Sequence, residues 1–298
     1  MEDFQDNQEI PQPAQTPCFS TEQIEGYHRT KRILLLAGIV LSLICWITWC
    51  ILADTWVLWL AGSTDHRWPA LLLTAFVMLG INTLIGLPLD FYGSFILEHR
   101  FNLSNQTARS WIVFQVKSWL VGAIIGGGLL AALYAALWYT GPLWGLYVWI
   151  GVMLFSIVLA KVFPLVILPI FYPAKPLDSP SLSERLTSLA ARANLTISGI
   201  FDLALSKDTK KANAMLAGLG SSRRVYLSDT LLDNFSDDQI AVVFAHELGH
   251  HIRGHIFKLI GIAAITTSLL VALIWWRLNP YAGGSTNEWT GAVTTFAH

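Results

Sequence analysis

The sequence predicts a mainly α, polytopic membrane protein, with about five transmembrane helices and one polar α+β domain on the cytoplasmic side. Three observations lead to this fold class. Apolar residues make up 54% of the 298 residues and charged residues only 13%, a balance outside the usual range of soluble domains. Five apolar runs are long enough to cross a bilayer. A long polar segment separates the fourth run from the fifth.

The apolar runs define the predicted membrane-spanning helices. A helix needs roughly 20 residues to cross about 30 Å of hydrocarbon. The runs lie at residues 33–60, 70–97, 111–139, 143–172 and 256–276. We therefore divide the chain into four parts, which are a polar, disordered tail (1–30), a membrane domain of four helices (31–172), a cytoplasmic domain (173–255), and a fifth helix with the loop after it (256–298).

The distribution of basic residues predicts the orientation in the membrane. Arg29, Lys31 and Arg32 precede the first run, whereas the loop after that run holds only Arg67. Loops rich in Lys and Arg stay on the cytoplasmic side, so the N-terminus is predicted to be cytoplasmic. Four crossings return the chain to the same side, and segment 173–255 is therefore predicted to be a cytoplasmic domain.

The polar domain combines helical and strand patterns. Residues 181–195, "SLSERLTSLAARANL", carry apolar side chains at helical spacing. The segments "ISGIFDLAL" (197–205) and "RRVYLSDTLL" (223–232) are rich in the residues typical of short strands, and 212–217 offers a further strand. Ser236 and Gln239 form a capping-box pair, which predicts the start of a helix through "AVVFAHELGHHIRGH" (241–255).

The motif "HELGH" on that helix predicts a zinc site. His246 and His250 are four residues apart, so both imidazoles lie on one face of the helix and can bind one Zn²⁺ ion. Glu247 is one step round the helix, where it can act as general base on a water at the metal. Such a catalytic zinc site uses a third protein ligand and keeps the fourth position open.

No acidic residue is indicated as the third ligand by its spacing. Asp229 and Asp233 precede the helix, at distances that fit no known pattern. Glu288 is the one acidic residue after His250, but in the predicted topology it lies beyond the fifth run, on the opposite side of the membrane. The residues themselves therefore predict two ligands and a base.

Two further histidines follow the motif. In zinc sites with three histidine ligands, a glycine and a histidine follow the second ligand at three and six residues. Here Gly254 and His255 are displaced by one position, and His251 directly follows the second ligand. We expect His251 and His255 to support the site or to line an interface near Arg253.

Several motifs in one order resemble a known family, the integral-membrane zinc metalloproteases typified by the type I CAAX prenyl endopeptidase. The resemblance covers residues 71–258, and the motifs that carry it are "LPLDFYGSFILEHRFNLSNQT", "FPLVILPIFYPAKPL", "SKDTKKANAMLAGLGSSRRVYLSDTLL" and "IAVVFAHELGHHIRGHI". It implies that His246 and His250 bind one zinc ion and that Glu247 is the catalytic base. It also implies that Asn213 and Ala214 lie on an edge strand that binds an extended substrate.

The resemblance also implies a function and its partners. The expected activity is hydrolysis of peptide bonds by a membrane-embedded zinc metalloendopeptidase, in CAAX-box protein processing of prenylated C-termini. The partners are a peptide or protein substrate, with or without a lipid, and the lipid bilayer. A net charge of −1 gives no overall attraction to nucleic acid, and no nucleic-acid partner is expected.

One departure from the family pattern leaves alternatives open. The family's third zinc ligand is a glutamate in a Glu-x-x-Ala-Asp motif after the histidines, and these 298 residues lack it. We therefore expect a zinc metalloendopeptidase that is a C-terminally truncated member and whose activity depends on that ligand. The alternatives are a membrane quality-control metalloprotease of the heat-shock type, and a catalytically silent membrane scaffold.

Overall fold

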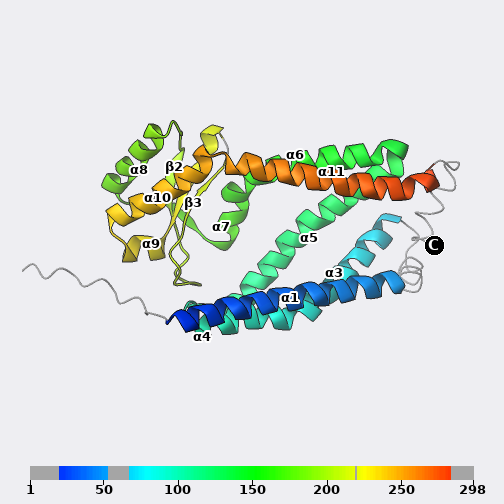
Figure 1. Ribbon diagram of the computed structural model, residues 1–298, viewed down its shortest axis with the longest axis horizontal. Coiled ribbons are helices and arrows are strands. Elements are labelled where there is room, and N and C mark those ends of the chain that lie inside the picture. Colours follow the sequence, from blue (N-terminus) through cyan, green and yellow to red (C-terminus); the bar gives the residue numbers. More distant parts are fainter. Residues whose placement is uncertain (1–19, 53–66, 219, 283–298) are drawn as a thin grey trace, which may run out of the picture.

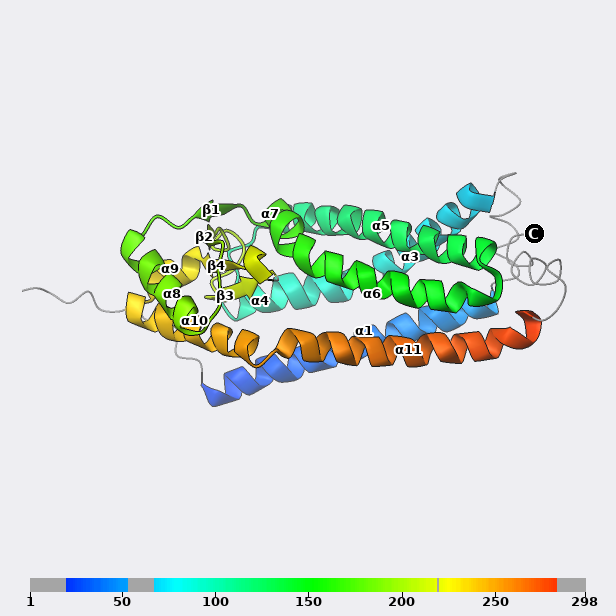
Figure 2. The same ribbon diagram turned by 90° about the horizontal axis from the view of Figure 1, so that it is seen from above.

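The computed structural model describes residues 20–52, 67–218 and 220–282 of the chain. Long helices form an elongated bundle, and a small sheet with its own helices lies at one end of it (Figure 1 and Figure 2). Within these described ranges, five helices are long and apolar enough to cross a membrane, which agrees with the number of spans predicted from the sequence. Glu288 and the first 19 residues of the predicted tail lie outside the described residues.

The bundle consists of five spans, two of which are built from several helical pieces. In chain order the elements are α1 (Thr21–Ile51), α3 (Arg67–Phe91), η1 (Tyr92–Ile96), α4 (Leu97–Arg100), α5 (Ala108–Tyr139), η2 (Gly141–Leu143), α6 (Trp144–Val162), η3 (Phe163–Ile167), α7 (Leu168–Phe171) and α11 (His255–Ala282). At most 11% of the residues in any spanning window are buried within the protein. Most apolar side chains of these helices therefore face outward, as in helices that lipid chains surround.

The first helix begins earlier than predicted. We expected residues 21–30 to belong to a disordered tail, but α1 starts at Thr21. Ser20 and Gln23 form a capping box, in which the backbone N–H of Gln23 donates to Ser20 Oγ at 3.2 Å and that of Ser20 donates to Gln23 Oε1 at 2.9 Å. Tyr27 in the second turn also donates to Glu98 of α4 at 2.8 Å, which holds this end of the helix in place.

The second and fourth spans each contain a π-helical turn near the sheet. These turns are η1 and η3, and each is followed by a last short α-helix, α4 or α7. Pro164 is the second residue of η3, and a proline lacks the N–H that an α-helix needs. Tyr226 of the sheet donates its hydroxyl to the Pro164 carbonyl at 2.6 Å and so joins the sheet to the fourth span.

The sheet has four strands in the order β1-β2-β4-β3. They are β1 (Ala174–Pro176), β2 (Gly199–Leu203), β3 (Ala214–Ala217) and β4 (Arg224–Ser228). The central strands β2 and β4 are parallel, and β1 and β3 pair with them in antiparallel fashion. In this sheet β3 is therefore an edge strand, paired on one side by β4.

The two faces of the sheet pack against different parts of the molecule. On one face lie α8 (Pro180–Arg192) and α10 (Asp237–Ile252), with a core that includes Leu186, Val225, Leu227 and Phe244, all fully buried. On the other face, Tyr226 packs with Leu168 from the end of the fourth span. The sheet thus lies between the "HELGH" helix and the membrane bundle.

The secondary structure of the small domain agrees with the prediction in most places and differs in two. The helix expected at 181–195 is α8, and the strands expected at 197–205 and 212–217 contain β2 and β3. The predicted strand 223–232 is β4 only as far as Ser228, because Ser228 caps a helix, α9 (Asp229–Asn234), by accepting from the N–H of Leu231. The strand β1 was not predicted.

Candidate metal centre

The helix α10 presents the "HELGH" motif, and its start agrees with the predicted capping box. The backbone N–H of Gln239 donates to Ser236 Oγ, and Gln239 Oε1 accepts from the backbone N–H of Ser236 at 2.9 Å. Phe244 and Leu248 lie on the buried face of the helix and fix its rotation against the sheet. This rotation leaves His246 and His250 exposed and Glu247 partly buried.

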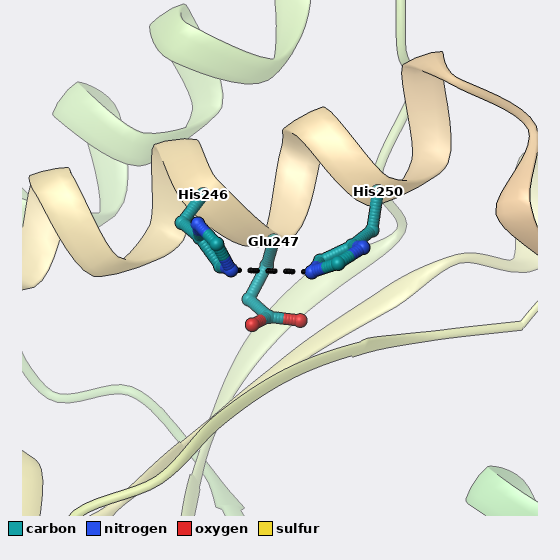
Figure 3. Close-up of side chains that lie close together, drawn as sticks. All are labelled: His246, Glu247 and His250. Carbon is teal, nitrogen blue, oxygen red and sulfur yellow. Dashed lines mark hydrogen bonds between the residues drawn. The ribbon is translucent and has the colours of Figure 1, made fainter.

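The three motif residues lie together on one side of α10 (Figure 3). The Nε2 atoms of His246 and His250 are 3.2 Å apart, and the possible ligand atoms of these two residues and Glu247 lie within 4.8 Å of one another. Two imidazole nitrogens bound to one tetrahedral zinc at about 2.0–2.1 Å would lie about 3.3 Å apart. The imidazole geometry therefore fits a zinc ion without rearrangement.

The two aspartates weighed as ligands are not part of this group. Among the described residues, the His/Glu cluster that could hold a metal contains neither Asp229 nor Asp233. Asp229 Oδ1 accepts from the backbone N–H groups of Leu205 and Ser206, at 3.0 and 2.8 Å. The Asp229 carboxylate therefore anchors the chain after β2.

His251 makes a contact that its position in the sequence did not specify. Its Nε2 lies 2.8 Å from the main-chain oxygen of Leu216 in β3. A carbonyl oxygen can only accept, so Nε2 carries the proton and donates. His251 therefore joins the motif helix to the edge strand by a hydrogen bond, which is the way in which it supports the site. The side chain of His255 lies outside the described part of the chain.

Asn213 and Ala214 lie at the start of the edge strand. The N–H of Ser228 donates to the oxygen of Asn213 at 2.9 Å, and the N–H of Asn213 donates to Ser228 Oγ at 2.8 Å. The main-chain N–H and C=O of Asn213 therefore face β4. Because successive residues of an antiparallel strand alternate in direction, the N–H and C=O of Ala214 point to the open edge.

A charged cluster ties the chain before β3 to the membrane helices. Glu98 of α4 forms ion pairs with Lys31 of α1 at 2.7 Å and with Lys211 at 2.8 Å, and its side chain is only 12% exposed. Burial opposes the charge of Lys211, but hydrogen bonds to Glu98 and Tyr27 raise its pKa. This cluster was not predicted from the sequence. Its signal was an acidic residue near the end of an apolar run, together with a pair of lysines.

The same segment has a second attachment, to the chain that leads into α5. Ser104 and Thr209 form an isolated antiparallel bridge, and Ser110 Oγ donates to Asp208 Oδ1 at 2.8 Å. Asp208 is a buried acidic residue, with 8% of its surface exposed. Residues 206–211, just before the edge strand, are therefore attached to α4 through Lys211 and to α5 through Asp208.

A cavity of about 620 Å³ lies between α1 and α3. Its walls are mostly apolar, and polar groups from Lys31, Asn82 and Asp90 also line it. Lys31 thus lines this cavity and also pairs with Glu98 of the charged cluster.

Comparison with protein families gives two matches that follow each other along the chain. A family described as CAAX prenyl protease N-terminal, five membrane helices, matches residues 18–173. Peptidase family M48 matches residues 176–291. The first match covers more than half of the chain, and the second includes the whole of α10.

Individual proteins and one solved structure agree with these matches. The chain is 29% identical to an uncharacterized metalloprotease of Bacillus subtilis, YhfN, over 84% of this chain and 58% of that protein. It is 32% identical to CAAX prenyl protease 1 of Saccharomyces cerevisiae, over 65% of this chain and 43% of the yeast protein. The crystal structure of S. mikatae Ste24p matches with a TM-score of 0.77 and 25% identity, covering 93% of this chain and 67% of that one. The chain spans about half the length of the curated relatives it matches.

Proposed function

Because the chain belongs to the CAAX prenyl protease family of the M48 peptidases, we propose that it carries the catalytic helix of a membrane-embedded zinc metalloendopeptidase. The observation that carries this proposal is the geometry on α10, where two imidazole nitrogens 3.2 Å apart stand beside a carboxylate. The family implies a metal, a peptide or protein substrate and a multi-pass membrane protein. Zinc is the metal that the two nitrogens fit by spacing.

In the proposed mechanism, His246 and His250 hold the ion and Glu247 moves the proton. Bound zinc supplies Lewis acidity, which polarises a peptide carbonyl and makes a water easier to deprotonate. Glu247 takes the proton from the attacking water and then donates it to the nitrogen of the leaving amine. Its partly buried position on the same side of α10 as the two histidines suits this role.

The edge strand would orient the substrate. The N–H and C=O of Ala214 point to the open edge of β3, and an extended peptide pairing there would add a strand to the sheet. Asn213, which faces β4, fixes the start of β3 through Ser228. We propose substrate binding at these two residues, which the family resemblance also implies.

We further propose that the substrate is a prenylated protein C-terminus cut on the cytoplasmic side. The yeast relative is named a CAAX prenyl protease, and the basic residues Arg29, Lys31 and Arg32, which lie in α1 before the first apolar run, favour a cytoplasmic N-terminus. The cavity between α1 and α3, about 620 Å³, has a size usual for a small-molecule site and mostly apolar walls suited to a lipid chain. The division into a tail, a membrane domain and a cytoplasmic domain with the motif helix belongs to the same proposal.

The decisive experiment measures peptide cleavage and zinc content of the protein with Glu247→Gln. General acid–base catalysis contributes about 10²–10⁴-fold, so we expect cleavage to fall by that factor while zinc stays bound. Glu184→Gln, at an exposed glutamate of α8, is the matched control and should leave both unchanged. Chelator-sensitive cleavage that survives Glu247→Gln contradicts the mechanism.

A second comparison tests the substrate. One peptide is prepared with and without a farnesyl group on its cysteine, and both forms are offered to the same preparation. A large preference for the farnesylated form supports CAAX processing. Equal cleavage of the two forms contradicts it and favours the quality-control alternative.

A further inference from the structure

The open edge of β3 offers the N–H and C=O groups of two residues to a pairing peptide. In an antiparallel strand the main-chain groups of successive residues alternate in direction. The N–H and C=O of Ala214 and Leu216 therefore point away from β4, whereas those of Met215 point toward it. A peptide that added a full strand would pair first with one of these residues and then, about 7 Å further along, with the other. The two positions are therefore the complete set of pairing sites on this short strand.

One of the two positions is already occupied from within the protein. His251 donates from Nε2 to the oxygen of Leu216 at 2.8 Å, so a peptide N–H would have to share that oxygen with the imidazole or displace it. Core packing holds both partners of the hydrogen bond between His251 and Leu216 in place. Leu216 is 6% exposed and packs in the same core as Leu248, three residues before His251 on α10.

We propose that His251 is a positioning residue that ends the substrate ladder at Leu216, so that Ala214 is the one residue of the edge strand that offers both its N–H and its C=O to a substrate without competition. This inference rests on the proposed binding of an extended peptide at β3. Whichever direction the peptide runs, its residue opposite Leu216 finds the imidazole in place of a main-chain acceptor. The chain beyond that residue must turn away from the sheet.

A short ladder has a consequence for the choice of substrate. Main-chain pairing holds any extended sequence, and each added pair lengthens the segment that must be unfolded to bind. With the ladder ended by His251, the protein needs only a short extended segment near the metal helix. A flexible protein terminus offers such a segment, whereas the interior of a folded domain does not.

The test measures how peptide affinity depends on peptide length. A nested series of capped peptides, each two residues longer than the last at one end or the other, is bound to the Glu247→Gln protein, which should not cleave them. With His251 present, dissociation constants should stop improving once the peptide reaches the position opposite Leu216. In the His251→Ala background, the next extension should improve affinity by about fivefold, the usual effect of one added hydrogen bond.

Two companion variants separate this role from a merely structural one. His251→Gln keeps an N–H donor and should restore the limit on length, whereas Arg253→Ala, at an exposed position of the same helix end, should leave the length dependence unaltered. Unfolding temperature and zinc content are measured alongside. A length dependence that is the same with His251 and with alanine overturns the inference.

Hydrogen exchange gives a second readout that does not depend on cleavage. With saturating peptide, the gain in protection on β3 should be confined to the Ala214 amide in the parent and should extend to the Leu216 amide in His251→Ala. If bound peptide increases the protection of β3 amides neither in the parent nor in His251→Ala, the inference is wrong. A protein that shows the expected exchange pattern but never cleaves supports the ladder and contradicts only the proposed chemistry.

Discussion

Replacing Glu98 with glutamine tests whether the membrane helices hold the chain that leads into the edge strand. The two oxygens of Glu98 accept from Tyr27 Oη at 2.8 Å, Lys31 Nζ at 2.7 Å and Lys211 Nζ at 2.8 Å. Glutamine has the same size, but it removes the charge and one of the two acceptor oxygens. At least one lysine therefore loses its partner, and two positive charges remain close together.

The loss of stability expected for Glu98→Gln depends on how exposed the partners of Glu98 are. The side chains of Lys31 and Lys211 are 36% and 47% exposed, so each ion pair contributes at most about 1 kcal/mol. The hydrogen bond from Tyr27 weakens by about 1 kcal/mol when its acceptor becomes neutral. We expect Glu98→Gln to lower the free energy of unfolding by about 2–3 kcal/mol.

The assay combines unfolding of the purified protein in detergent with limited proteolysis of residues 206–213. A double-mutant cycle of Glu98→Gln with Lys211→Met should give a coupling energy of about 0.5–1 kcal/mol, with faster cleavage of that segment in both single variants. Lys258→Met, at an exposed lysine of α11, is the matched control. A coupling energy within about 0.3 kcal/mol of zero refutes the idea that Glu98 holds Lys211.

The pH dependence of the same contact has a definite sign. The hydrogen bonds of Lys211 to Glu98 and Tyr27 outweigh the opposing effect of burial and raise its pKa above 10.5. Its contribution to stability is therefore complete at neutral pH and is lost as the pH rises from 10.5 through the raised value. Lys211→Met should remove this part of the alkaline loss of stability.

Three further substitutions probe the contacts around the sheet, each checked by unfolding in detergent. Tyr226→Phe removes the hydroxyl that donates to Pro164 at 2.6 Å and should cost about 1–3 kcal/mol by leaving that carbonyl without its partner. Burial, and then the charge of Asp208, raise the pKa of Tyr172 to about 12, so stability should fall between pH 10 and 12, and Tyr172→Phe should show less of this fall. Gly218→Ala should destabilise by about 1–3 kcal/mol, because φ is +100° and the new Cβ would lie 2.6 Å from a backbone oxygen.

The features predicted correctly are those that depend on residues close together in the sequence. An apolar run of sufficient length is a helix in lipid whatever it contacts, and the five spans were found on that basis. The capping box at Ser236 and Gln239 fixes the start of α10 within four residues of sequence. The side-by-side placement of His246 and His250 follows from helical geometry alone.

The features that were missed depend on residues far apart in the chain. Glu98 and Lys211 meet only because α4 and the segment before β3 are brought together by the fold. His251 and Leu216 are 35 residues apart, and no local pattern connects them. The helix α9 lies where a strand was expected, because Ser228 ends β4 by capping the next helix.

The position of the candidate metal helix relative to the membrane is determined by the sheet more than by the chain that follows the helix. Between α10 and α11 lies a two-residue turn, in which Gly254 adopts a φ of +62°. Glycine has a wide choice of backbone angles, so this turn by itself would not fix the direction of α10. The sheet packs its one face on α10, and through Tyr226 its other face contacts the fourth span. Tyr226→Phe should therefore loosen the metal helix from the bundle, and hydrogen exchange across α10 should rise even though no residue of that helix is changed.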